Sequence, residues 1–127
     1  MNGRIYDGFV PGRHPIDAYG AGGFRFADMS HRGSILVLPS GIKAWAPTQR
    51  RGLVPEDFAP VFAEAEAIEL LLLGTGADIV PVSEAVRWRF REVGIRLDTM
   101  QTGAAARTYN ILLAENRRVA AALIAVP

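Results

Sequence analysis

The sequence predicts a three-layer α/β domain in which a central mixed β-sheet is covered by helices. Apolar strand candidates alternate with helical segments in the second half of the chain, which is typical of parallel strands joined by crossovers. Two strands, Leu70 to Leu73 and Ala120 to Val126, show no polar alternation, as expected of strands covered on both faces. Two β-favouring runs flank the turn residues Pro39-Ser40-Gly41 and predict a hairpin.

Length and composition favour one soluble domain over residues 1–127. Half of the 127 residues are apolar and 21% are charged, which is too hydrophobic for disorder. The longest apolar runs are far shorter than the roughly 18 residues of a membrane span. The net charge of +1 gives no broad field to attract nucleic acid. The absence of cysteine excludes disulfides and thiolate chemistry, and it fits a reducing compartment.

Glycine and proline residues indicate the turns that separate the expected elements. Residues 1–32 are rich in both, and we expect them to form an irregular, β-rich N-terminal part. The expected strands are Ile5 to Val10, Gly23 to Phe26, Ile35 to Leu38, Ile42 to Trp45, Ile68 to Leu73, Ile95 to Thr99 and Val119 to Val126. The expected helices run from about Pro55 to Glu66, Val82 to Val93 and Thr102 to Glu115.

The helix from Val82 has one apolar stripe. A rotation of about 100° per residue aligns Val82, Val86, Phe90 and Val93, and Gly94 supplies the stop signal. Glu84, Arg87 and Arg91 lie opposite the stripe. Trp88 falls on the polar flank, where it either lies along the surface of its own domain or contacts a partner.

The helix from Thr102 is apolar on two sides. Ala105, Tyr109, Leu112 and Leu113 form the expected core face, whereas Ala104, Ile111 and Ala114 lie on the far side. Either other elements cover the far side, or it is an oligomer or partner surface around Ile111. The candidate partner-binding residues are therefore Trp88, Ile111 and Ala114.

Two loops are candidates for a ligand site. Gly74, Thr75 and Gly76 follow one apolar strand, and Thr99 to Gly103 follow the next, at the sheet end where α/β proteins place ligands. The candidate ligand-binding residues are Gly74, Thr75, Gly76, Thr99, Thr102, Arg107 and Asn110. The motif lacks both the third glycine of a dinucleotide site and a phosphate-loop lysine. The alternative interpretation is that the glycines form turns and the threonines cap or begin the helix.

No motif predicts catalysis, a metal or a cofactor. The serines lie in no nucleophile elbow, although sequence alone leaves carboxylate-pair chemistry open. The pairs His14-x-x-Asp17 and Asp28-x-x-His31 contain metal-ligand residue types, but they lie in irregular chain that does not fix their geometry. We therefore predict no catalytic residue, no metal site and no cofactor.

The order of several motifs resembles a known family. These motifs are the hairpin with Trp45, a strand ending Leu-Gly-Thr-Gly, Gly94-Ile95, Asp98-Thr99, Ala104-Ala105, Thr108-Tyr109-Asn110, Leu113, Glu115, Arg117 and Ala121-Ala122-Leu123-Ile124. From about Gly33 onward the chain is similar to a bacterial and archaeal domain of unknown function. The mitochondrial relative of that domain is the third assembly factor of respiratory complex I, NADH:ubiquinone oxidoreductase.

The resemblance implies a three-layer α/β fold and a non-catalytic role in building a membrane-bound respiratory enzyme, alongside another assembly factor. In alphaproteobacterial members it also implies a link to genes for the membrane machinery of protein secretion. It implies no catalytic residues. Met1 to Tyr6 show neither an apolar signal core nor a mitochondrial presequence, which favours a bacterial cytoplasm, with association at the inner membrane left open.

The leading hypothesis is therefore an interaction or assembly factor for complex I or other inner-membrane proteins, with protein partners and a possible homo-oligomer. The alternative is a small-molecule-binding protein or enzyme that uses the crevice at Gly74 to Gly76 and Thr99 to Gly103.

Overall fold

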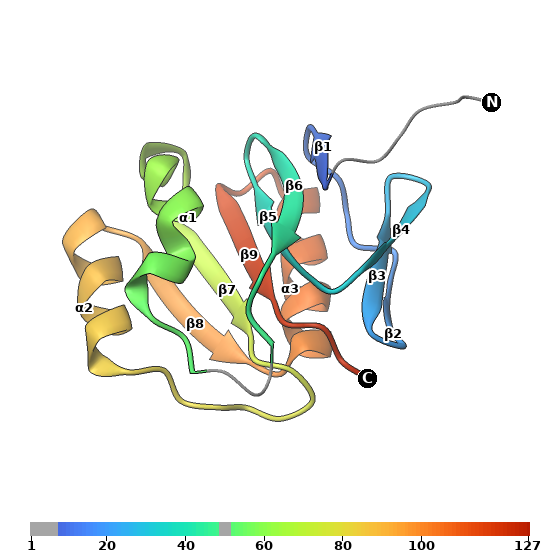
Figure 1. Ribbon diagram of the computed structural model, residues 1–127. Coiled ribbons are helices and arrows are strands. Elements are labelled where there is room, and N and C mark those ends of the chain that lie inside the picture. The colour runs from blue at the N-terminus through green and yellow to red at the C-terminus, as the bar shows by residue number, and fades with distance from the viewer. Residues whose placement is uncertain (1–7, 49–51) are drawn as a thin grey trace.

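A computed structural model describes residues 8–48 and 52–127 and contains a central mixed sheet of six strands (Figure 1). The strand order is β1-β6-β5-β9-β7-β8, with β9, β7 and β8 parallel and the other neighbours antiparallel. The strands are β1 (Phe9–Pro11), β5 (Ser34–Leu38), β6 (Gly41–Trp45), β7 (Leu70–Gly74), β8 (Arg96–Met100) and β9 (Val119–Leu123). The predicted fold class is confirmed.

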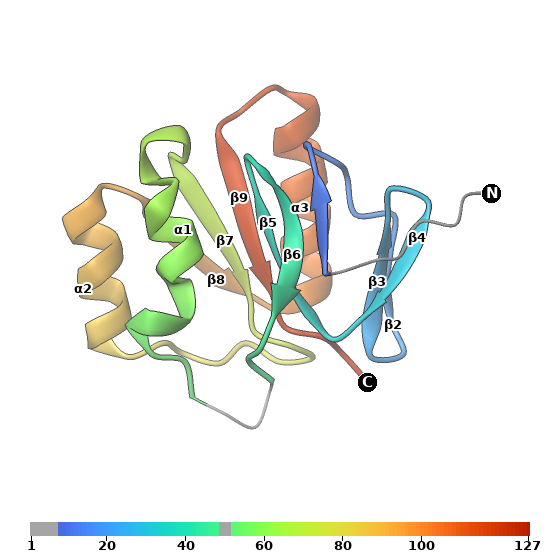
Figure 2. The ribbon, with the colours of Figure 1, turned by 45° about the horizontal axis from the view of Figure 1, so that its top comes forward.

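Helices and a second sheet cover the two faces of the central sheet. The second sheet contains β2 (Ala18–Gly20), β3 (Gly23–Phe26) and β4 (Met29–Arg32). Figure 2 shows this small sheet and α3 (Thr102–Ala114) on the face opposite to α1 (Ala59–Ala63) and α2 (Glu84–Val93). Two 3₁₀ turns, η1 (Pro55–Phe58) and η2 (Ala65–Ala67), flank α1.

The core has two halves, one on each face of the central sheet. In β7, Leu70 and Leu72 pack toward α3 and the small sheet, whereas Leu71 and Leu73 pack toward α1 and α2. Successive side chains of a strand point to opposite faces, so a strand between two layers needs apolar residues at every position. This geometry explains the uninterrupted apolar runs in β7 and β9.

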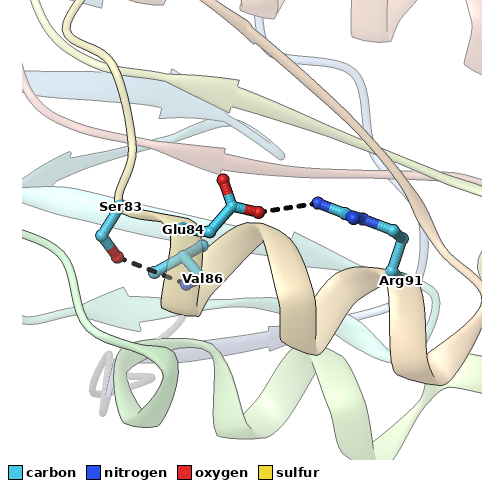
Figure 3. Close-up of polar contacts among 4 residues, drawn as sticks. All are labelled: Ser83, Glu84, Val86 and Arg91. Atoms are coloured by element: carbon cyan, nitrogen blue, oxygen red, sulfur yellow. Dashed lines mark hydrogen bonds and ion pairs between the residues drawn. The ribbon is translucent and has the colours of Figure 1, made fainter.

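Most local predictions hold with small shifts at the ends, but the single helix expected from about Pro55 to Glu66 is divided into η1, α1 and η2, and β9 ends at Leu123 rather than Val126. β5 and β6 form the predicted hairpin, with Leu38 opposite Gly41. Helix α2 begins at Glu84 rather than Val82, because the Ser83 hydroxyl caps it by accepting from the Val86 N–H at 3.3 Å (Figure 3). It ends at Val93, and Gly94 follows as the C-cap with a left-handed φ of 77°.

The N-terminal part is more regular than expected. Residues 9–32 form β1 and all of the second sheet, of which the sequence predicts only Gly23 to Phe26 and part of β1. The predicted strand start at Ile5 lies outside the described residues. Phe24 and Phe26 bring the small sheet into the core, where they pack with Tyr109 of α3.

Burial of Tyr109 predicts a loss of stability in alkali. Burial raises the pKa of Tyr109 to about 12, although the charge of Arg13 opposes the shift. An unfolded tyrosine titrates near 10, so the contribution of Tyr109 to the free energy of unfolding is fully present below about pH 10. That contribution, about 3 kcal/mol, is lost as the pH rises through about 12. Free energies of unfolding from urea melts between these pH values should show this slope.

Two matched variants test the assignment. Tyr109→Phe should remove the alkaline slope, whereas Tyr19→Phe should keep it, because Tyr19 is 45% exposed. An unchanged slope in Tyr109→Phe would show that another group is responsible.

Candidate functional site

The two loops predicted to converge lie side by side at the carboxyl ends of β7 and β8. The Thr75 N–H donates to the Met100 carbonyl at 2.9 Å, and the Thr102 N–H donates to the Gly76 carbonyl at 2.8 Å. The convergence follows from the parallel register, which places Leu73 beside Thr99 and Gly74 beside Met100.

Thr102 joins three segments of chain through its hydroxyl group. The hydroxyl accepts from the Gly76 N–H at 2.9 Å and donates to the Ile124 carbonyl at 2.7 Å, and Thr102 is fully buried. Gly74 permits this contact, because a Cβ at position 74 would lie 2.8 Å from the Thr102 Cα. The Ile124 N–H in turn donates to the Gly74 carbonyl at 2.9 Å.

The side chains of Thr75 and Gln101 in these loops are also paired within the protein. The Thr75 hydroxyl donates to the Asp78 carbonyl at 2.6 Å and accepts from the Val80 N–H at 3.0 Å. Gln101, rather than Thr99 or Thr102, caps α3 by accepting from the Gly103 N–H at 3.0 Å. Thr102 is the first helical residue instead. These contacts hold the two loops against each other, and we call this region the loop junction.

Three of the seven candidate ligand residues border two separate hollows. Thr75 borders a hollow of about 360 Å³ with Val80, Pro81 and Val82. Arg107 and Asn110 border another, of about 200 Å³, beside Tyr19 and Gly103. Gly74, Gly76, Thr99 and Thr102 line neither hollow.

Asn110 has a structural partner that the sequence did not suggest. Its amide oxygen accepts from the Ile16 N–H and its amide nitrogen donates to the Ile16 carbonyl, both at 2.8 Å. Both ends of the side chain therefore hold the segment before β2 against α3.

The three candidate partner-binding residues are exposed. Ile111 is 54% and Trp88 is 55% exposed, and Ala114 is also exposed. The Arg91 guanidinium lies 5.7 Å from the centre of the Trp88 ring. It also binds Glu84 at 2.9 Å across two turns of α2 (Figure 3). Exposed aromatic and arginine side chains are frequent in protein interfaces.

The histidines lie apart from any cluster of ligating side chains. Within residues 8–48 and 52–127, no group of three or more His, Asp or Glu side chains is placed to hold a metal ion. A ring nitrogen of His14 lies 3.0 Å from the Pro11 carbonyl. His31 packs near Phe26, and burial lowers the pKa of His31.

Comparison with known proteins establishes the family. The profile of the family described as "Protein of unknown function (DUF498/DUF598)" matches residues 16–124. The chain belongs to the DUF498/DUF598 family. A relative described as an uncharacterized protein of Rhodobacter capsulatus is 39% identical over 116 residues, which are 91% of this chain and 88% of that protein.

Two further relatives carry descriptive names. The NADH dehydrogenase [ubiquinone] 1 alpha subcomplex assembly factor 3 of Mus musculus is 29% identical over 112 residues. That match covers 88% of this chain but 60% of the mouse protein, so the chain spans about three fifths of its length. A crystal structure titled as an outer membrane protein from Bartonella henselae is 53% identical, with a TM-score of 0.88 over 92% of this chain and 98% of that one.

The length and apolarity of the helices bear on whether they could cross a membrane. None of the helices in the described residues is long and apolar enough to cross a bilayer.

Proposed function

We propose that this protein is a non-catalytic interaction factor that helps to assemble respiratory complex I or other inner-membrane proteins. The observation that carries the proposal is the match of 88% of the chain to a protein named as a complex I assembly factor. The pairing of polar groups around Thr102 also favours a structural role for the loop junction. The proposed partners are another assembly factor or membrane-protein machinery. We propose that the protein binds them in the cytoplasm, at the surface of the inner membrane.

Deletion of the gene in the native host tests this proposal. We expect the amount of assembled complex I in isolated membranes, measured on native gels, to fall. Succinate dehydrogenase in the same membranes serves as the control and should be unchanged. An affinity-tagged chain should co-purify with complex I subunits or with an assembly factor. Normal complex I levels in the deletion strain would contradict the complex I role.

The far side of α3 is the part of the surface that we propose for self-association or partner capture. Ile111→Asp should weaken the association while leaving the fold intact, because the side chain is 54% exposed and a carboxylate is poorly accommodated in an apolar contact. Light scattering and the co-purification measure association, and circular dichroism measures folding.

Ile79→Asp is the matched control, since Ile79 is an exposed isoleucine at 65% in a different part of the surface. It should retain every association of the parent protein. If folded Ile111→Asp also retains them all, Ile111 is outside the interface. If Ile111→Asp unfolds, the far side is part of the core.

A further inference from the structure

Strand β8 forms one edge of the central sheet. In the described part of the chain, its ladder partner is β7 alone. The Arg96 N–H donates to the Glu69 carbonyl, and the Met100 carbonyl accepts from Thr75, so these residues turn their backbone groups toward β7. Alternate residues of a parallel strand face opposite sides, so the backbone groups of Leu97 and Thr99 point away from the sheet. Such an edge is able to pair with an added strand.

A basic groove runs beside this edge, between α2 and β8. Its volume is about 330 Å³, and Phe90, Ile95 and Leu97 contribute apolar lining. The charged residues that line it are Arg87, Arg91 and Arg96. None of the described residues that line it is acidic. We call this feature the β8 groove.

The β8 groove keeps a positive charge despite two nearby carboxylates. Glu84 lies 2.9 Å from Arg91, and Asp98 lies 3.9 Å from Arg96. Both pairs are largely exposed, so each is worth little and is readily exchanged. No ion pair of Arg87 occurs within the described residues.

An exposed aromatic side chain extends the surface next to the groove. Trp88 neighbours Arg87 and stacks with Arg91, and it lies within the same exposed part of α2. Tryptophan and arginine are among the residue types enriched at energetically dominant interface contacts.

We propose that the β8 groove binds an extended acidic segment of a partner protein, which adds to β8 as a further strand. The backbone groups of Leu97 and Thr99 supply the hydrogen bonds, and the groove arginines receive the carboxylates of the added segment. The inference deepens the proposed function, because it gives the chemistry of a partner. Its test is independent of any assembly phenotype.

Charge favours this occupant over a second copy of the chain. Edge-to-edge pairing of two β8 strands would bring two arginine-lined grooves together, and like charges in an interface oppose association. An anionic membrane would satisfy the arginines but would leave the outward backbone groups of Leu97 and Thr99 without strand pairing. Both remain distinguishable outcomes of the test.

A labelled synthetic peptide is the probe. We would use an acetylated, amidated peptide of about seven residues that alternates glutamate and valine, with a lysine–valine peptide as its charge-reversed control. Fluorescence anisotropy should show binding of the acidic peptide alone. The binding should weaken when the ionic strength rises from about 50 to about 300 mM.

Matched variants locate the binding. The double variant Arg87→Glu with Arg96→Glu should weaken peptide binding by about tenfold or more. Arg89→Glu is the control on the same helix, because the Arg89 guanidinium lies 4.9 Å from the centre of the Phe62 ring, outside the groove lining. It should change the affinity by less than about twofold. Equal effects of the two changes, or binding of the lysine peptide, would overturn the proposal.

Amide hydrogen exchange separates strand addition from simple charge attraction. Saturating peptide should slow exchange at Leu97 and Thr99, whose N–H groups point outward, more than at Arg96 and Asp98, which already face β7. Peptide binding without this pattern would overturn the strand-addition model.

Two further measurements decide between occupants. A dimer in sedimentation that the Arg87→Glu, Arg96→Glu variant abolishes would assign the groove to a second copy. Groove-dependent binding to phosphatidylglycerol vesicles, without binding to the peptide, would assign it to a membrane. Both results overturn the proposal. If the peptide does not bind but the deletion strain has less complex I, the groove proposal alone is rejected. If the peptide binds as expected but the deletion strain has normal complex I, the assembly role alone is rejected.

Discussion

Replacing Phe90 with alanine is expected to lower the free energy of unfolding by about 3 to 5 kcal/mol. Phe90 is 1% exposed, and its ring packs edge-on against the rings of Phe58 at 5.1 Å and Phe62 at 5.0 Å between centroids. Truncation removes this contact between α2 and the segment of η1 and α1, and it leaves a cavity that these elements cannot easily close. Midpoints and slopes of urea unfolding curves measure the loss.

Arg91→Ala is the control on the same helix, one residue further on. Arg91 points to solvent, where its side chain is 62% exposed, and its partner Glu84 is 77% exposed. An exposed ion pair contributes at most about 1 kcal/mol, so this variant should unfold close to the parent protein. Equal losses in the two variants would mean that the core-facing side of α2 has been assigned wrongly.

Much of the architecture could be predicted because the buried faces of helices and strands produce a periodic pattern of apolar residues in the sequence. The stripe of α2 contains Val86 and Phe90, which are fully buried or nearly so, and Gly94 ends the helix as expected. The apolar runs of β7 and β9 predicted strands covered on both faces, and residues of both strands lie in both halves of the core. These signals are local, and each spans enough residues to show a helical or strand pattern.

The second sheet was difficult to predict because its strands contain three or four residues each. So short a run shows no dependable alternation, and its pairing depends on tight turns between the strands. Ala27 and Asp28, between β3 and β4, both have positive φ values, although neither is glycine. The turn between β3 and β4 therefore carries no glycine signal in the sequence.

The candidate site shows the same limit at the level of single residues. Sequence placed the loops of Gly76 and Thr102 near each other, because parallel strands end at one edge of a sheet. It could not show that Asn110 binds the backbone of Ile16, which is 94 positions away in the chain. Arg87 and Arg91 are visibly one helical turn apart, but the β8 groove exists only because β8 is the outermost strand.

The loop junction provides the second large expected effect. Thr102→Val keeps the shape of the side chain but removes the hydroxyl that joins the Gly76 N–H to the Ile124 carbonyl. Thr102 is fully buried, and Gly76 is buried as well, so the two backbone groups lose their side-chain partner where water has little access. An unpaired buried group costs about 1 to 3 kcal/mol, and we expect a total loss near 3 kcal/mol.

Thr99→Val is the matched control for this experiment. Thr99 lies on the adjacent strand, is half-buried, and makes no side-chain hydrogen bond within the described residues, so the same chemical change should be nearly neutral. Urea unfolding gives the two free energies, and amide exchange at Gly76 should accelerate in Thr102→Val alone because its acceptor is gone. If Thr102→Val retains the stability of the parent protein and the slow exchange of Gly76, the hydroxyl is not what locks the loops. The polar groups at this junction would then be available for a ligand, as the alternative reading of the sequence requires.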